Sequence, residues 1–267
     1  PLKKFLKSLH KEPFGNFVIF RSVMSLAIMV AGPFFAIYML KDLGLRYLHY
    51  TAIILVPMIA KILSAKAWGH YATHFGNRTL MQTSTALVVL APLLWFIAGW
   101  LLQETPYIFL AILLIEALNG MAWAGFELTT FNYMLETTTP ALRATFFAYF
   151  NIIFGTAVLA GGLAGIGLNA MLQHTKNATP ILLIFLASFL FRLIAASTLM
   201  PRVPHVEVHQ KIGQGRIFYE LFVQRPMGFA VAPLTRYGIL QGRTRTLSSA
   251  TKKTIRRITG PLRIKKR

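Results

Sequence analysis

The chain has 267 residues, of which 55% are hydrophobic and 13% charged, and its mean hydropathy of +0.56 excludes an ordinary soluble domain. The net charge of +20 could suggest nucleic-acid binding, but the basic residues flank apolar runs, so we expect no nucleic-acid partner. Because the sequence contains no cysteine, disulfides and thiolate metal sites are excluded.

Six apolar runs follow one another along the chain, each as long as the roughly 20 residues that a helix needs to cross a bilayer. They cover Phe14 to Leu40, Leu45 to Ala67, Thr79 to Leu101, Pro106 to Leu135, Arg143 to Leu172 and Pro180 to Met200. The sequence therefore predicts an all-α membrane protein in which a bundle of six transmembrane helices, residues 14–200, lies between a basic lead-in, residues 1–13, and a basic tail, residues 201–267.

The distribution of basic residues predicts the orientation of these spans. With six spans both termini lie on one side, and the lead-in and the tail are both rich in Lys and Arg. The loops expected on that side carry Lys66, Arg78 and Arg143. Since cytoplasmic loops carry an excess of Lys and Arg, we expect both termini in the cytoplasm and the bundle in the plasma (inner) membrane.

Between the second and third runs the sequence reads WGHYATHFGNR, residues 68–78. This segment resembles the cytoplasmic signature of the major facilitator superfamily, G-x-x-x-D-[RK]-x-G-[RK]-[RK]. Gly69, Gly76 and Arg78 match it, whereas an acid and two bases are replaced by Thr73, His74 and Asn77. The glycines suit a tight reversal, and the arginine can meet carbonyl groups at a helix end or an acidic partner. The family uses the acidic position to latch conformations, and this chain lacks that acid.

Two further segments, residues 116–126 and 139–144, resemble bacterial members of the same superfamily. The resemblance covers about residues 14–200 and implies a transporter with twelve spans in two halves, each made of inverted three-helix repeats, that binds its solute between the halves. This chain would supply spans seven to twelve, and its partner would be the missing amino-terminal six-helix half. A beginning at Pro1 rather than Met also suggests a partial chain.

The fourth run carries a polar stripe. Glu116, Asn119, Gly120, Trp123 and Glu127 are spaced so that they share one face of a helix, and we expect that face to line a cavity. Ionisable groups within a span cost about 2.5 to 3.5 kcal/mol each and are therefore candidates for function. Because a low dielectric constant favours the neutral form of a carboxyl group, Glu116 and Glu127 are candidates for proton coupling.

A structural role is the alternative for both carboxylates. They would then pair with Arg21 or Lys61, or form hydrogen bonds with Asn119 and Asn151. Trp123 could stack on an organic solute or simply fill space.

Basic residues within the spans also have two interpretations. Arg21 could bind an anionic group or Glu127, or it could extend to the lipid headgroups at the cytoplasmic surface. For Lys61 and Arg192 we favour such snorkelling, because both lie within a few turns of that surface.

The fifth run contains Gly161 and Gly165, whose spacing lets helices approach closely, either for packing or as part of a gate. The sequence contains no motif for a cofactor, a metal site or catalysis, so we expect neither cofactor nor enzymatic activity. In the tail, residues 247–258 could form an interfacial helix on anionic lipid headgroups or remain solvated.

The sequence thus predicts half of a secondary active transporter that moves a small solute by alternating access and is driven by a coupling ion, with proton coupling as one form. Two alternatives remain. The chain could be a membrane sensor or scaffold that does not transport, or it could be a complete six-span half-transporter that functions as a homodimer.

Overall fold

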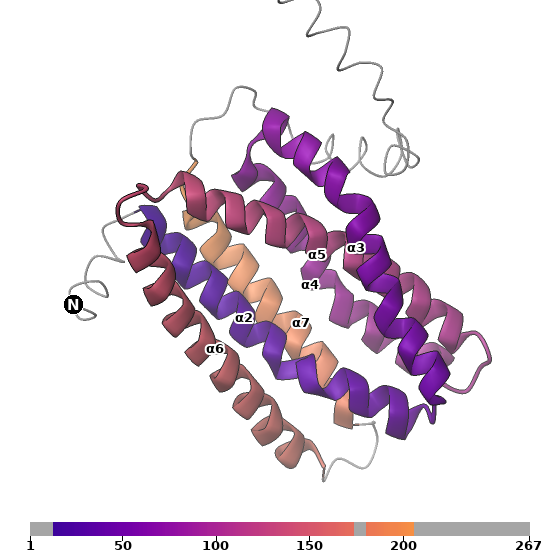
Figure 1. Cartoon of the computed structure of the whole chain (residues 1–267). Coiled ribbons are helices and arrows are strands. Elements are labelled where there is room, and N and C mark those ends of the chain that lie inside the picture. The colour runs from indigo at the N-terminus through magenta and orange to yellow at the C-terminus, as the bar shows by residue number, and fades with distance from the viewer. Residues whose placement is uncertain (1–12, 174–179, 206–267) are drawn as a thin grey trace, which may run out of the picture. The chain divides into compact units, whose positions relative to one another are not determined.

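The computed structural model describes residues 13–173 and 180–205, and these contain six long helices (Figure 1). They are α2 (Pro13–Ile37), α3 (Tyr47–Phe75), α4 (Asn77–Leu102), α5 (Ile108–Glu136), α6 (Arg143–Leu172) and α7 (Pro180–Leu199). A π-helical turn, η1 (Tyr38–Asp42), continues α2, and a 3-10 turn, η2 (Met200–Arg202), ends α7. Each long helix is apolar and long enough to cross a membrane, so the predicted all-α class with six spans is confirmed.

The helices form two units of three, α2–α4 and α5–α7, whose members make equivalent contacts. Helix α3 packs on α5 as α6 packs on α2, helix α4 packs on α5 as α7 packs on α2, and α4 packs on α7. Figure 1 shows α6, α2 and α7 side by side in one half of the view and α4, α5 and α3 in the other. Exchange of the two units leaves the list of pairs unchanged, as a three-helix repeat predicts.

Two of these equivalent contacts depend on glycine. A Cβ atom on Gly120 of α5 would collide with the backbone of Pro57 in α3, and Cβ atoms on Gly161 and Gly165 of α6 would collide with the backbone of α2 at Leu26 and Val30. The pair that the sequence singled out for close packing therefore lies where two helix backbones touch.

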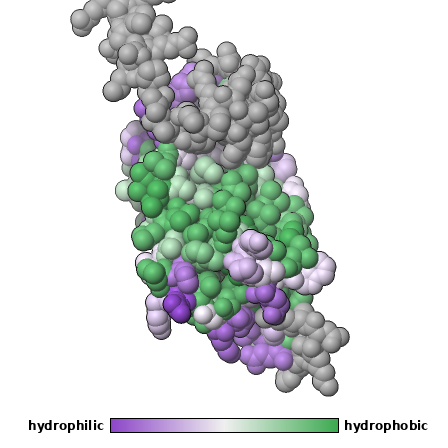
Figure 2. Space-filling view, turned by 90° about the vertical axis from the view of Figure 1, so that its right-hand side faces the viewer, coloured by the Kyte–Doolittle hydropathy of each residue, from purple (hydrophilic) through white to green (hydrophobic). Residues whose placement is uncertain are grey.

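The outer surface of the bundle is apolar. Large side chains such as Ile62 of α3 and Leu163 of α6 are exposed, at 73% and 69%. Figure 2 shows one face that is mainly hydrophobic, with hydrophilic residues gathered toward its lower end. Such a surface suits hydrocarbon rather than water, because a large exposed apolar area is unfavourable in an aqueous environment.

The junction of α3 and α4 differs from the predicted loop. Helix α3 continues to Phe75, eight residues beyond the Ala67 at which the second span was expected to end, so most of the signature segment is helical. The reversal takes place at Gly76 alone, whose φ of 79° lies in the region that favours glycine. The sequence boundary was wrong because it followed hydropathy, whereas helical hydrogen bonding continues through polar residues at the membrane surface.

Side chains from three helices hold the segment that follows α7. Arg78 donates hydrogen bonds to the carbonyl oxygens of Pro201 and Val203 at 3.3 and 2.6 Å, as expected for a base that meets carbonyls at a helix end. Asn16 of α2 donates to the carbonyl of Arg202 at 3.1 Å. Tyr133 of α5 donates to the carbonyl of residue 204 at 2.9 Å, so four consecutive carbonyls are bound.

The position next to Arg78 joins α4 to α5. Asn77, which replaces a base of the signature, donates to the carboxylate of Glu136 at 2.5 Å and accepts from Asn132 at 3.2 Å. The amide that replaces a base of the signature therefore binds a carboxylate at the end of α5. Residues 1–12 of the lead-in and the helix predicted at 247–258 lie outside the described residues.

Candidate functional site

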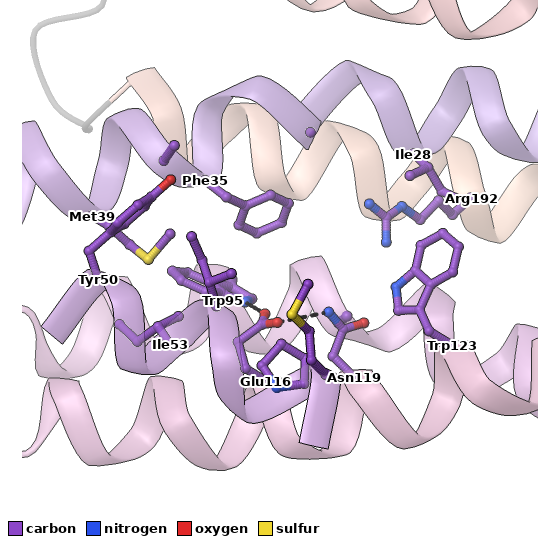
Figure 3. Close-up of a pocket in the computed structure, with 16 residues that line it drawn as sticks. Ile28, Phe35, Met39, Tyr50, Ile53, Trp95, Glu116, Asn119, Trp123 and Arg192 are labelled. Atoms are coloured by element: carbon purple, nitrogen blue, oxygen red, sulfur yellow. Dashed lines mark hydrogen bonds between the residues drawn. The ribbon is translucent and has the colours of Figure 1, made fainter. Parts of the chain in front are cut away.

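A pocket of about 440 Å³ lies between α2, α3, α4, α5 and α7. Glu116, Asn119 and Trp123 of α5 and Arg192 of α7 form its polar end (Figure 3). The opposite end includes Met39, Tyr50 and Ile53, and Phe35 lies between the two ends, across from Glu116. The pocket thus has one charged end and one aromatic and aliphatic end.

Glu116 is held by two donors. Its carboxylate accepts a hydrogen bond from Nε1 of Trp95 at 2.8 Å and one from Nδ2 of Asn119, one turn further along α5, at 3.1 Å. The indole of Trp95 is in turn fixed by edge contacts with Phe35 and Phe185. Among the described residues, Oδ1 of Asn119 is buried without a hydrogen-bond partner. The carboxylate is therefore fixed in position, and an unused acceptor lies beside it.

Arg192 is buried, with 3% of its surface exposed, and does not extend to the headgroups. Its Nη1 donates to the carbonyl oxygen of Val88 in α4 at 2.9 Å. Pro92 lies four residues after Val88 and has no N–H, so this carbonyl lacks its helical donor and the guanidinium replaces it. Nε donates to Oγ of Ser188 at 3.2 Å, and Ser188 donates to the carbonyl of Ala27 in α2 at 2.7 Å.

The snorkelling predicted for Arg192 was therefore wrong. The position of a residue along a span does not show whether a neighbouring helix offers a free carbonyl. Arg192 ties α7 to α4 directly and to α2 through Ser188. It lies one residue from the midpoint of the span Pro180–Arg202, which places a positive charge near the centre of the bundle.

Glu116 and Arg192 face the same space from opposite walls, and each lies in the electrostatic field of the other (Figure 3). Within the described residues they make no direct salt bridge. The structure thus brings together an acid, a base and an amide at one end of a partly enclosed cavity. Such separated charges can act on a molecule that enters between them.

The polar stripe of α5 is divided by the structure. Glu116, Asn119 and Trp123 line the pocket, and Gly120 lies against α3. Glu127 lies outside the pocket, where its Oε2 pairs with Nζ of Lys61 at 2.5 Å, and the two side chains are 46% and 43% exposed. The snorkelling predicted for Lys61 was wrong, whereas the alternative in which it pairs with a carboxylate of α5 is what the structure shows.

Arg21 lies apart from the pocket and is 9% exposed. Its guanidinium donates to Oγ of Ser25 and lies over the rings of Phe126 and Phe154, 4.8 and 4.9 Å from their centroids. Glu127 acts on it only through its field. Aromatic faces attract a cation, so these rings stabilise Arg21 inside the bundle, where no acid among the described residues pairs with it directly.

Asn151 is exposed on α6 and does not line the pocket. In the part of the chain that the structure describes, no three His, Cys, Asp or Glu side chains gather as metal ligands would. Sequence reasoning missed Arg192, Trp95 and Phe35 as parts of the site. The available signal was Ser188 one turn before a mid-span arginine, together with a proline inside the third span.

The fold and the pocket define a class: a polytopic helical membrane protein with a polar cavity near the middle of its spans. The comparisons with known proteins identify the family. The Major Facilitator Superfamily matches residues 17–256, which is most of the chain, and the chain therefore belongs to it. The predicted resemblance is confirmed, and the match continues into the tail beyond residue 200, where the sequence alone had indicated no relationship.

The chain is 27% identical over 216 residues to YhjO, an uncharacterized MFS-type transporter of Bacillus subtilis (strain 168). The alignment covers 80% of this chain and 51% of that relative, so the chain spans about half its length. No solved structure matches. The chain is an integral membrane protein of a transporter family, whose members bind small-molecule solutes and are not classed as enzymes.

Proposed function

We propose that this chain forms the carboxyl-terminal half of a secondary active transporter that moves a small solute by alternating access, with Glu116 as the site at which a proton binds. The pocket that holds Glu116 opposite Arg192 carries this proposal. It supplies a cavity, a proton acceptor and a fixed counter-charge near the centre of the bundle. Ionisable groups at that depth are costly and are retained where they serve transport.

Glu116 is a better proton site than Glu127. Its carboxylate lies in a pocket, and its direct hydrogen-bond donors, Trp95 and Asn119, are neutral. Glu127 is already neutralised by Lys61 in a half-exposed ion pair. A carboxylate without a bonded cation changes charge more readily than one that would leave a cation unpaired.

The proposal includes an amino-terminal half that this sequence does not contain. The relative YhjO is about twice as long as the aligned region, which supports a second set of spans. In α3 and in α6 only 11% of an apolar stretch of 18 residues is buried, so both helices have faces available to another helical unit. A homodimer of this chain is the alternative arrangement that would cover the same faces.

We also propose that both termini face the cytoplasm and that the protein resides in the plasma (inner) membrane. Three basic residues lie at the junctions of α3 with α4 and of α5 with α6, which share one end of the bundle: Lys66, Arg78 and Arg143. An excess of Lys and Arg is typical of cytoplasmic loops and supports this orientation. The basic tail would then meet anionic headgroups, to which near-surface cations contribute about 1 kcal/mol each.

The experiment is a solute screen with the full-length protein in proteoliposomes that contain a pH-sensitive dye. Each solute is added outside, and solute-driven proton entry is recorded. We expect at least one solute to drive proton entry, and Glu116→Gln to abolish this signal while the variant remains folded. The matched control is Glu104→Gln, because Glu104 is exposed in the loop between α4 and α5.

Solute uptake without proton movement would leave a transporter but remove proton coupling. Proton entry that survives Glu116→Gln would remove Glu116 as the proton site. If no solute is moved and the purified chain instead captures a soluble protein through its tail, the sensor or scaffold alternative replaces transport.

A further inference from the structure

The charged end of the pocket offers more donors than the protein uses. A guanidinium carries five N–H groups, and among the described residues Arg192 uses one for Val88 and one for Ser188. Three N–H groups thus remain for a ligand. Figure 3 shows the guanidinium beside Trp123 and directed toward the space above Asn119 and Glu116. A planar group with two or more free donors suits a carboxylate or another oxyanion.

The opposite end of the pocket suits an apolar body. Met39 and Ile53 provide aliphatic surface there, the ring of Tyr50 provides aromatic surface, and the ring of Phe35 extends this surface toward the middle of the pocket. A volume of about 440 Å³ is in the range for one small organic molecule. The pocket therefore fits a molecule with one oxyanion at one end and a ring or short alkyl group at the other.

We propose, on the basis of the function proposed above, that the solute is a small amphipathic organic monoanion that binds at Arg192 and moves together with a proton carried by Glu116. The titratable side chains that line the pocket are Glu116 from α5, Arg192 from α7 and Tyr50 from α3, and the lining residues of α2 and α4 carry no titratable group. The charge balance at this end is therefore set by Glu116 and Arg192.

Charge balance couples the two ligands. When the pocket is empty, ionised Glu116 offsets Arg192 and the site has no net charge. When a proton from solvent neutralises Glu116 and one anion binds Arg192, the site is neutral again. A proton alone leaves a charge of plus one, and an anion alone leaves minus one. A net charge is costly in a medium of low dielectric constant, so the empty and the fully loaded forms change conformation most readily.

The same geometry predicts cooperative binding. An anion at Arg192 repels a negative charge on Glu116, because both would occupy the same end of the pocket. The anion therefore binds more tightly when Glu116 is protonated. The reciprocal effect follows from linkage, since each ligand must change the affinity for the other by the same factor.

The test compares four ligands that share a benzyl group and differ in charge: phenylacetate, phenethylamine, phenylalanine and phenylacetamide. Binding to the purified full-length protein is measured by quenching of tryptophan fluorescence, since Trp95 and Trp123 both line the pocket. We expect phenylacetate to bind about tenfold or more tightly than the other three at a pH where Glu116 is protonated and phenylacetate itself is still ionised. Its affinity should fall by a similar factor as the pH rises and Glu116 ionises.

Variants assign the effect to the two residues. Glu116→Gln should keep the affinity for phenylacetate and remove its pH dependence. Arg192→Gln should abolish binding. If that variant does not fold, Arg192→Lys replaces it in the test, and because it keeps the charge it should retain part of the affinity for phenylacetate. Arg46→Gln is the matched control for loss of a cation, because Arg46 is exposed at the start of α3.

Preference for phenylalanine at every pH would overturn the proposal in favour of a zwitterion, and preference for phenethylamine would overturn it in favour of a cation. Weak binding of phenylacetate with no dependence on pH or on Arg192 would also overturn it. The general function is judged separately. If phenylalanine drives Glu116-dependent proton entry, the transport proposal stands and the anion fails. If phenylacetate binds as expected but no solute moves protons, the anion site stands and coupled transport fails.

Discussion

Two glutamates of α5, Glu116 and Glu127, share one face of the helix but lie in different surroundings. Glu116 receives hydrogen bonds from two neutral donors inside a pocket, and Arg192 acts on it across that space. Glu127 makes a direct ion pair with Lys61, and nearly half of each side chain is exposed. The difference shows that the neighbouring helices, rather than the periodicity of α5, determine what a carboxylate in this bundle can do.

The neighbours differ because the two cations have different partners. Arg192 is held by a carbonyl that Pro92 leaves free, so its position does not depend on Glu116. Lys61 has Glu127 as its direct partner. Glu116 can therefore change its charge while its counter-charge stays in place, whereas a change at Glu127 would break an existing contact.

The largest effect is expected at Arg192. Arg192→Met should lower the free energy of unfolding by about 3 to 5 kcal/mol, because it leaves the Val88 carbonyl without a donor and Glu116 without a counter-charge. Lys61→Met should cost about 1 kcal/mol or less, since its ion pair is half exposed. Chemical denaturation of the full-length protein in detergent measures both. Equal losses for the two variants would remove the contrast between the two cations.

The close contact of α5 with α3 should be the next most sensitive feature. Gly120→Ala forces a Cβ atom into the backbone of Pro57 and should cost about 1 to 3 kcal/mol. The matched variant is Gly155→Ala on α6, where no atom lies within 4 Å of the added Cβ. Differential scanning fluorimetry should give a lower melting temperature for the first variant only. Unchanged melting in both would show that α3 and α5 are not held this closely.

Near the carboxyl-terminal end of α5, loss of a single hydrogen bond should have a smaller effect. Tyr133→Phe removes the donor to the carbonyl of residue 204 and should cost about 1 kcal/mol. Tyr107→Phe is the control, because Tyr107 is 68% exposed. Limited proteolysis beyond α7 provides a local measurement, with faster cleavage expected in Tyr133→Phe. Cleavage at the same rate in both variants would mean that Tyr133 does not hold this segment.

The smallest effect concerns the ion pair itself. A double-mutant cycle with Lys61→Met and Glu127→Gln should give a coupling energy of about 0.2 to 1 kcal/mol, and added salt should decrease it. A coupling of several kcal/mol that resists salt would show that the pair is shielded from solvent. Glu127 would then have surroundings like those of Glu116, and the comparison between the two acids would lose its basis.

The class of fold and the family follow from local features of the sequence. Six apolar runs specify six spans because hydropathy is a local property of the chain, and a few residues such as Gly76 and Arg78 indicate the superfamily. Local spacing also placed Glu116, Asn119 and Trp123 on one face of α5. Hydropathy did not locate the end of α3, since a helix continues beyond the membrane as long as its backbone hydrogen bonds do.

Which charged residues meet depends on the packing of the helices and could not be predicted from the sequence. Lys61 and Glu127 are 66 residues apart in the chain, and Arg192 reaches a carbonyl 104 residues away. Such contacts depend on how the helices pair and on the carbonyl left free by Pro92, and neither is visible in the local pattern around Arg192. The same pairing places an acid and a base on opposite walls of one pocket, because five helices converge there and each contributes a single face.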